Sequence, residues 1–296
     1  MPTLVVVLKG GLGNQLFQYA AARALADRAG ADLAIDAWTG FAQDYRYRRK
    51  PALAAFPVRG RPATLAERLP YWLFEFRRRI PGASIGPVHR GPGGTFLIEP
   101  GMRFNGEIHD ARWKGTAWMD GYWQTDRWFA DGSRTLADIE PPEPARREAV
   151  ELGARMATED SVAIGIRLYE ESKVPAAHAR TGRMRSAAEI RNAIARVLAD
   201  HPGRKPYVFC THRAPLLGEL GLPAHAEFLV PEAGFTDAAE TLWLMGRCRH
   251  IVFTNSSLYW WAAWLGDRLH AGRDRRVLAA DDFLDPDSIR AGWERW

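Results

Sequence analysis

Three stretches of the sequence place glycines, amides, hydroxyls or an arginine directly after an apolar run, where a ligand could be held. The first covers residues 9–26 (KGGLGNQLFQYAAARALA) and follows the valine- and leucine-rich run of residues 4–8. The apolar run predicts a strand buried on both faces, and the residues after the glycines predict an amphipathic helix. Glycines permit a tight turn, and the N–H groups of the helix start point at whatever occupies it. The candidate ligand contacts here are Gly11, Gly13, Asn14 and Gln15.

The second stretch, SVAIGIR at residues 161–167, places Arg167 where a predicted strand ends. In open α/β sheets, ligands bind beyond the carboxyl ends of the strands. An arginine there can hold a phosphate through its two-pronged guanidinium group. The spacing supports equally a surface ion pair between Arg167 and Glu170 or Glu171.

The third stretch, FTNSSLYWWAAWLG at residues 253–266, repeats the order strand, turn and helix. Asn255, Ser256 and Ser257 would supply hydroxyls and N–H donors at the helix start, which is an anion site by geometry. Ordinary N-capping of the helix is the alternative interpretation. We expect the three tryptophans of the helix to pack in the core or between domains. They are Trp260, Trp261 and Trp264.

A dinucleotide site is a weaker alternative for the glycine turn. Gly11 and Gly13 follow a strand and open a helix, and Asp36 ends the next predicted strand, where an acid would bind ribose. The third glycine of the G-x-G-x-x-G pattern falls on Leu16, however. An oxidoreductase that uses NAD or FAD therefore stays open but disfavoured.

The elements that must position these residues form two α/β halves. Three prolines within residues 139–145 (IEPPEPA) cannot lie inside a helix or a central strand, so this segment is the candidate linker. We predict domains at residues 1–140 and 146–296. After the linker, strands alternate with helices over short loops, which indicates a parallel, doubly wound sheet. In the first half we expect a helix within residues 62–80, a loop over residues 81–94, and strands around 96–109 and 113–122.

Composition excludes several classes of protein. The 296 residues are 47% hydrophobic without an 18-residue apolar run or a charged-then-apolar leader, which argues against a membrane span or signal peptide. The net charge of +5 suits a nucleotide or another anion and does not require nucleic acid, for which no binding signature is present. Cys210 and Cys248 form no disulfide framework, which favours the cytoplasm. Residues 71–79 (YWLFEFRRR) could contact an anionic membrane, although a core helix is the favoured interpretation.

Taken together, these stretches resemble one enzyme family. The first stretch is similar to the N-terminal signature of the bacterial α-1,2-fucosyltransferases of glycosyltransferase family 11. GYWQTDRWF, at residues 121–129, resembles that family's GYxQSExYF segment. LWLMGRCRHIVFTNSSLYWWAAWLG, at residues 242–266, resembles its LMSxCKHxIxANSSFSWWxAWL block. The three blocks keep the family's order and rough spacing over most of the chain.

One block departs from the family pattern, in which the strand ends in His-x-Arg-Arg-x-Asp. Arg167 retains the first arginine, whereas Gly165 replaces the histidine, Leu168 the second arginine and Glu170 the aspartate. The family's Ser-Asp-Asp after the next strand is also altered. The residues at its place are Cys210, Thr211 and His212.

The resemblance implies a GT-B fold, with two Rossmann-like domains facing a cleft. It implies a nucleotide sugar in the C-terminal domain and a glycan acceptor toward the N-terminal one. The implied reaction is inverting transfer of L-fucose from GDP-fucose to a sugar hydroxyl, without a metal or another cofactor. Near the C-terminus, Asp285-Pro286-Asp287 has the D-x-D form of metal-dependent transferases, but we expect N-capping there.

Charge that develops on the β-phosphate needs fixed donors, and we expect Arg167 and the helix start at Ser256 and Ser257 to supply them. The predicted catalytic residues are Arg167, Glu170 as proton acceptor, and Asn14. The predicted ligand-binding residues are Gly11, Gly13, Gln15, Arg167, Thr211, His212, Asn255, Ser256 and Ser257. A GT-B protein with another nucleotide-sugar donor, or a glycan-binding member with weakened catalysis, is the alternative. We expect a cytoplasmic protein, with peripheral contact at the inner membrane left open.

Overall fold

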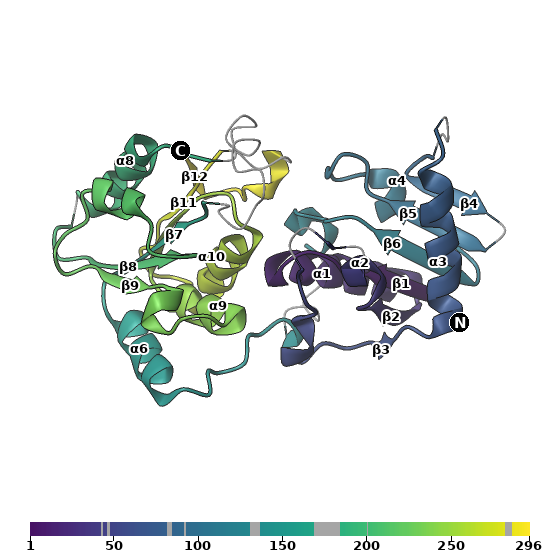
Figure 1. Cartoon of the computed structure of the whole chain (residues 1–296), viewed down its shortest axis with the longest axis horizontal. Helices are drawn as coiled ribbons and strands as arrows, with labels where there is room; N and C mark the ends of the chain where they lie inside the picture. Colours follow the sequence, from purple (N-terminus) through teal and green to yellow (C-terminus); the bar gives the residue numbers. More distant parts are fainter. Residues whose placement is uncertain are drawn as a thin grey trace. The chain divides into compact units, whose positions relative to one another are not determined.

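The computed structural model divides into two compact units, Met1–Glu140 and Pro141–Trp296, which are described one at a time (Figure 1). The structure describes the chain except for residues 43, 46–47, 82–84, 92, 131–136, 169–183, 200 and 282–285. Each unit contains one six-stranded sheet. The expected α/β class with parallel sheets is confirmed.

In the N-terminal unit the strands lie in the order β3-β2-β1-β6-β5-β4. All neighbouring pairs are parallel except β4 with β5. The strands are β1 (Thr3–Val7), β2 (Asp32–Asp36), β3 (Arg61–Pro62), β4 (Val88–Gly91), β5 (Gly94–Ile98) and β6 (Thr116–Asp120). The helices are α1 (Leu12–Ala29), α2 (Thr39–Ala42), α3 (Leu65–Arg78) and α4 (Gly106–His109), with 3₁₀ turns η1 (Leu53–Ala55) and η2 (Asp126–Trp128).

The sequence explains why this unit folds as it does. Leu4 to Val7 in β1 are buried, which fits a strand covered on both faces. Thr64 begins α3 through a capping box with Glu67, in which each side chain accepts from the other residue's N–H. The expectation of a loop over residues 81–94 was wrong in part, because Val88–Gly91 forms β4 and pairs antiparallel with β5.

In the C-terminal unit all strands are parallel, in the order β12-β11-β10-β7-β8-β9. The strands are β7 (Ser161–Ile166), β8 (Lys205–Cys210), β9 (Glu227–Leu229), β10 (His250–Phe253), β11 (Val277–Ala279) and β12 (Glu294–Arg295). The helices are α6 (Arg147–Thr158), α8 (Ala187–Leu198), α9 (Ala238–Arg247) and α10 (Ser257–Leu269). The 3₁₀ turns are η3 (Pro215–Glu219), η4 (Pro231–Ala233) and η5 (Pro286–Ser288).

Alternate residues of β7 serve the two faces of this sheet. Val162, Ile164 and Ile166 join the apolar cluster that includes Ile190 and Ile194 of α8. Gly165, with the opposite phase, lies against side chains of α9 and α10. The tryptophans of α10 are core residues, as expected: Trp260 and Trp261 are fully buried and Trp264 nearly so.

Candidate functional site

Three predicted ligand-binding residues lie side by side at the carboxyl edge of the C-terminal sheet. Gly165 of β7 pairs with Phe253 of β10, and Ile166 pairs with Cys210 of β8. Arg167 and Thr211 directly follow β7 and β8, and Asn255 follows β10 by two positions, so the three residues lie at one edge of the sheet. Parallel pairing thus brings together residues that are more than 40 positions apart in the sequence.

A threonine that sequence reasoning overlooked fixes the main chain at this edge. Thr254 is buried, its N–H donates to the Gly165 carbonyl at 3.0 Å, and its Oγ1 accepts from the N–H of Arg167 at 2.7 Å. The side chain of Thr254 thereby takes over strand pairing where β7 and β10 end. Arg167 is half-buried, and its backbone is held without the use of its own guanidinium group.

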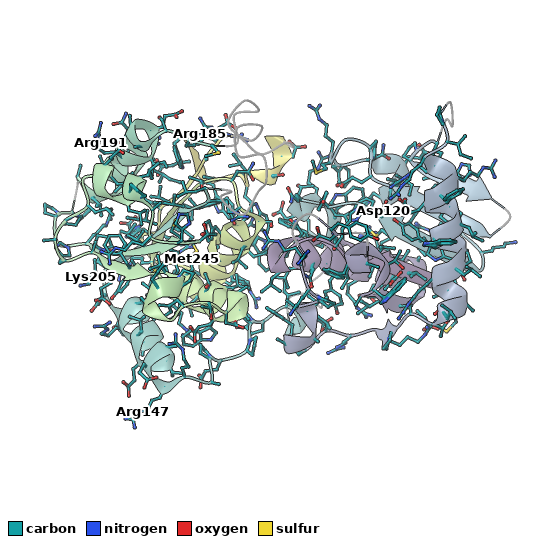
Figure 2. All side chains as sticks on the ribbon, viewed as in Figure 1. Asp120, Arg147, Arg185, Arg191, Lys205 and Met245 are labelled. Atoms are coloured by element: carbon teal, nitrogen blue, oxygen red, sulfur yellow. The ribbon has the colours of Figure 1, made fainter. Side chains whose placement is uncertain are left out.

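Packing leaves no room for a side chain at Gly165, where the family that the sequence resembles has a histidine. A Cβ atom on Gly165 would lie 2.5 Å from Cε of Met245 and 2.7 Å from Cδ2 of Tyr259 (Met245 is labelled in Figure 2). The Tyr259 hydroxyl lies 3.3 Å from the Ile166 carbonyl oxygen, which fixes the ring over the glycine. In the family block quoted above, the position of Tyr259 carries serine. The space of a histidine side chain is therefore occupied by the tyrosine ring.

Leu168, at the position of the second arginine in the resembling family's motif, lies in the core. It is 7% exposed and belongs to the apolar cluster with Ile164 and Ile166. Of the two arginine positions in this motif, position 167 therefore carries an arginine at the edge of the sheet, whereas position 168 carries a buried leucine. Glu170, the predicted proton acceptor, and Glu171 lie outside the described residues.

The helix start of α10 combines capping with accessible polar groups. Ser256 is the N-cap and accepts from the N–H of Tyr259, as the N-capping interpretation expected. Asn255, Ser256 and Ser257 are each half-buried. Because α10 has 13 residues, its N-terminus presents a positive dipole end at the sheet edge that carries Arg167.

A pocket begins directly after Thr211 and His212, which follow β8. Thr211 is exposed and His212 half-buried. The guanidinium carbon of Arg213 lies 4.8 Å from the centre of the Phe228 ring. The pocket is open to solvent, has a volume of about 400 Å³, and is lined by Arg213, Ala214, Pro215, Leu217, Gly218 and Phe228.

In the N-terminal unit, the glycine turn is joined to the GYWQ segment of residues 121–124. Gly10 has a φ of +77°, and a Cβ atom there would lie 2.6 Å from Nδ2 of Asn14, so this turn requires glycine. The side chain of Gln124 donates to Oδ1 of Asn14 at 2.9 Å. Two of the motif stretches thus meet through an amide pair. Gly11 is half-buried at the helix N-cap, and Gly13 is buried within α1.

The side chain of Gln15 binds the protein backbone and does not face a ligand site. Its side chain is fully buried, Nε2 donates to the carbonyls of Gly10 and Lys50, and Oε1 accepts from the N–H groups of Ala52 and Leu53. Both donors and both acceptor positions of the amide are thereby used. We therefore reassign Gln15 from ligand contact to support of the chain around residues 50–53.

A charge network that the sequence did not reveal lies beside the glycine turn. Asp120, at the end of β6 and 2% exposed, accepts from Nζ of Lys9 at 2.5 Å and from Arg78 of α3 at 3.0 Å (Figure 2 labels Asp120). Arg78 also contacts Glu75 at 2.6 Å. The two cations lower the pKa of Asp120 despite its burial.

Glu99, which follows β5, holds the GYWQ segment. Its two carboxylate oxygens accept from the N–H groups of Tyr122 at 2.6 Å and Trp123 at 2.8 Å. Trp123 has a φ of +58°, which is unusual for a non-glycine residue and is stabilised by this contact. Burial raises the pKa of Glu99 to about 7, against the effect of the two N–H donors.

Asp36 does not suit the dinucleotide interpretation. Its side chain is fully buried, and Oδ1 accepts from the N–H groups of Trp38 and Thr39, each at 3.0 Å. A ribose-binding acid must face the ligand, whereas this carboxylate is turned into the start of α2. Among the described residues, no group of three or more His, Cys, Asp or Glu side chains is arranged to hold a metal ion. Both cysteines are buried, and neither forms a disulfide.

Comparisons with known proteins show which fold the chain has but do not assign it to a family. No family model matches the chain, and no curated protein sequence matches it significantly. Among solved structures, the fucosyltransferase NodZ from Bradyrhizobium matches with a TM-score of 0.53 and 18% identity, covering 90% of this chain and 93% of that one. NodZ α-1,6-fucosyltransferase co-crystallised with GDP gives a TM-score of 0.52, and the form soaked with GDP-fucose gives 0.53, at the same identity and coverage. The chain therefore has the GT-B fold of this glycosyltransferase.

Proposed function

We propose that the protein is a glycosyltransferase that moves L-fucose from GDP-fucose to a sugar hydroxyl of a glycan. The observation that carries the proposal is the carboxyl edge of the C-terminal sheet. Arg167, the helix start of α10 and Thr211 lie there together, in a fold that a GDP-fucose-binding fucosyltransferase shares. A family 11 relationship, an α-1,2 linkage and an inverting mechanism are part of the proposal, through the sequence resemblance.

In this proposal the diphosphate binds at the edge that carries Arg167. Bond cleavage leaves growing negative charge on the β-phosphate, and fixed donors that meet this charge lower the barrier. The guanidinium group of Arg167 and the N–H groups at the start of α10 are the donors that we assign to it, with Asn255, Ser256 and Ser257 around them. The fixed main chain at Thr254 keeps Arg167 in place.

We assign the nucleobase to the pocket beyond β8. The pocket starts at Arg213, two residues after Thr211, so that a ribose could bridge the phosphate edge and the pocket. The guanidinium plane of Arg213 and the ring of Phe228 offer flat surfaces for a purine. Thr211 and His212 are then the expected ribose or phosphate contacts.

The acceptor is assigned to the N-terminal unit. Around the glycine turn, Lys9 and Asp120 neutralise each other, and Asn14 and Gln124 present amide groups. A neutral sugar suits such a surface, because its hydroxyls need hydrogen-bond partners and no net charge. Glu170 remains the proposed proton acceptor by its position in the motif. Two cysteines without a disulfide fit a reducing cytoplasm.

Another nucleotide-sugar donor is the second candidate, and the motif at β7 favours it. Gly165 and Leu168 remove a histidine and an arginine from the family pattern, and both positions are built into the core here. A donor with a different base or sugar would use the same phosphate edge. A glycan-binding member with weakened catalysis would also fit these replacements.

Calorimetric titration of the full chain with GDP, UDP, ADP and NAD tests the proposal. We expect GDP to bind, with the affinity lost in Arg213→Ala and kept in the control Arg147→Ala, an exposed arginine of α6. GDP-fucose should then release GDP in the presence of a glycan acceptor. Preference for UDP or ADP would select the second candidate, and binding of NAD alone would reject both.

A further inference from the structure

Helix α3 exposes a stripe of large apolar side chains. Of the ten large hydrophobic residues that are exposed among those the structure describes, six belong to α3 or follow it directly. We name them the α3 stripe: Leu65, Leu69, Trp72, Leu73, Phe76 and Ile80. Leu65 is 79% exposed and Phe76 is 71% exposed, so these side chains are not partly hidden core residues. Single exposed apolar residues are ordinary, whereas a contiguous group marks a surface that is covered by something.

The stripe occupies one side of the helix. At the rotation of an α-helix, about 100° per residue, these positions fall within roughly 100° of one another. Tyr71 and Phe74 lie on the other side and pack with Val5, Val7 and Trp118 in the core of the unit. The helix thus has two apolar faces, and the fold of its own unit covers one of them.

Charges around the stripe select a negatively charged partner. Arg77 and Arg79 are exposed at the C-terminal end of the helix, next to Phe76 and Ile80. The two acidic residues of the helix are turned away and paired, since Glu67 binds Arg61 and Glu75 binds Arg78. Two copies of this chain that met through the stripe would bring like charges together, which disfavours a dimer.

We propose that the α3 stripe docks on the surface of an anionic lipid bilayer, with the helix lying in the interface. An apolar face with tryptophan and phenylalanine, bordered by arginines, is the pattern of an interfacial helix. None of the described helices could cross a membrane, and α3 has 14 residues, too few to span a bilayer of ordinary thickness. This attachment goes beyond the proposed reaction and does not depend on the donor.

Sedimentation with lipid vesicles tests the proposal on the full chain. The probes are phosphatidylcholine vesicles with and without phosphatidylglycerol. We expect binding to the anionic vesicles, which falls by about tenfold or more in Trp72→Ser/Phe76→Ser. Arg77→Glu/Arg79→Glu should abolish the preference for anionic lipid. Added salt should likewise weaken the binding of the wild-type protein to anionic vesicles.

A matched control comes from the other unit. Arg268 is exposed and Leu269 is 50% exposed in the last turn of α10, so Arg268→Glu/Leu269→Ser changes the same residue types away from α3. This variant should bind vesicles like the wild type. Thermal unfolding should be unchanged in all three variants, because the altered side chains are exposed.

Three results would overturn the proposal. They are failure of the wild type to bind anionic vesicles, undiminished binding by the α3 variants, and an equal loss in the α10 control. If light scattering detects a dimer that Trp72→Ser/Phe76→Ser dissociates, the stripe belongs to a second copy instead. GDP binding by a protein that ignores vesicles would reject the docking surface and leave the proposed reaction standing.

Discussion

Among the described residues, each unit has a charge network at one end of its sheet, and the two networks lie at opposite ends. In the N-terminal unit the network of Lys9, Arg78 and Asp120 lies at the carboxyl edge. In the C-terminal unit the comparable network lies at the amino edge. There Asp160, which precedes β7, is paired with Arg204 at 3.2 Å and with Nε2 of His250 at 3.0 Å.

This difference separates the tasks that the two carboxyl edges can perform. At the N-terminal edge, charge is already neutralised, and the groups that remain suited to a ligand are the amides of Asn14 and Gln124. At the C-terminal edge, the main chain of Arg167 is fixed by Thr254, and its side chain carries the positive charge that a diphosphate needs. A neutral sugar suits the first edge and a diphosphate suits the second.

Loss of Arg167 should have the largest effect on activity. If its guanidinium group meets charge that grows in the transition state, Arg167→Ala should lower turnover more than donor affinity. Removal of one such donor costs on the order of 3–4 kcal/mol, or roughly 10²–10³ in rate. Arg167→Lys should restore little of the lost turnover, because an ammonium group cannot make the two parallel hydrogen bonds of a guanidinium group. The measurement is transfer and donor hydrolysis with GDP-fucose.

Thermal unfolding of the same variants provides the control. The N–H of residue 167 that binds Thr254 survives in Arg167→Ala, so β7 and β10 should stay joined at their ends and the variant should stay folded. Activity within about threefold of the wild type would leave Arg167 as a surface residue without a phosphate role. A large loss of stability would make the arginine structural.

Packing between Gly165 and Tyr259 should give the next largest effect. Gly165→Ala inserts a methyl group against Tyr259 and Met245, which should cost about 1–3 kcal/mol of unfolding free energy. Tyr259→Ser leaves a cavity and should cost about 3–5 kcal/mol. The double variant Gly165→His/Tyr259→Ser carries the pair of the family that the sequence resembles. It should be more stable than the summed effects of Gly165→His and Tyr259→Ser predict, by at least about 1 kcal/mol.

Denaturant titration of the single and double variants measures this coupling. Strict additivity would show that the histidine space and the tyrosine ring are independent. That result would remove our explanation of the altered motif. A positive result would also let the restored histidine be tested for an effect on GDP binding.

The sequence allowed more of the fold than of the site to be predicted. Residues 4–8 predict a buried strand from local composition, and the alternation of strands with helices after residues 139–145 made the parallel sheet predictable. The contacts of the site depend on distant partners instead. Lys9 meets Asp120 across 111 positions, and Arg167 meets Thr254 across 87.

Side chains that could serve either a ligand or the protein itself were the second reason that the site was hard to predict from the sequence. The amide of Gln15 could serve a ligand or the backbone, and only the fold shows that residues 50–53 use it. The large apolar residues of α3 fit a core helix, yet most of them face outward, whereas Tyr71 and Phe74 pack in the core. Sequence alone does not show which apolar face a sheet will cover.

Acid should weaken the C-terminal unit before the N-terminal one. Burial lowers the pKa of His250 and of His270 to about 4, from about 6.5 in the unfolded chain. The unfolded chain then binds more protons, so stability is complete above pH 6.5 and is lost as the pH falls toward 4. Each histidine contributes at most about 3 kcal/mol to this loss.

Hydrogen exchange by mass spectrometry can follow each unit at several pH values. Peptides of the C-terminal unit should lose protection below pH 6.5. His270→Gln, which can still donate to the Arg247 carbonyl, should reduce that loss. His201→Gln, at an exposed position in the same unit, is the matched control. Loss of protection first in residues 1–140 would reverse the predicted order.

Glu99 should give the smallest effect, with the opposite dependence on pH. Its folded pKa of about 7 lies above the ordinary value of 4.5, so the folded state binds more protons between these two values. Stability should then fall as the pH rises from 4.5 through 7, by on the order of 2 kcal/mol since the carboxyl is partly exposed. Glu99→Gln should flatten this dependence in the N-terminal unit.

Because the carboxylate positions Tyr122 and Trp123, we expect only a severalfold loss of turnover in Glu99→Gln. A loss above about 10² in a stably folded Glu99→Gln variant would instead make Glu99 the group that takes the proton from the acceptor. The neutral character assigned to the N-terminal edge would then be wrong.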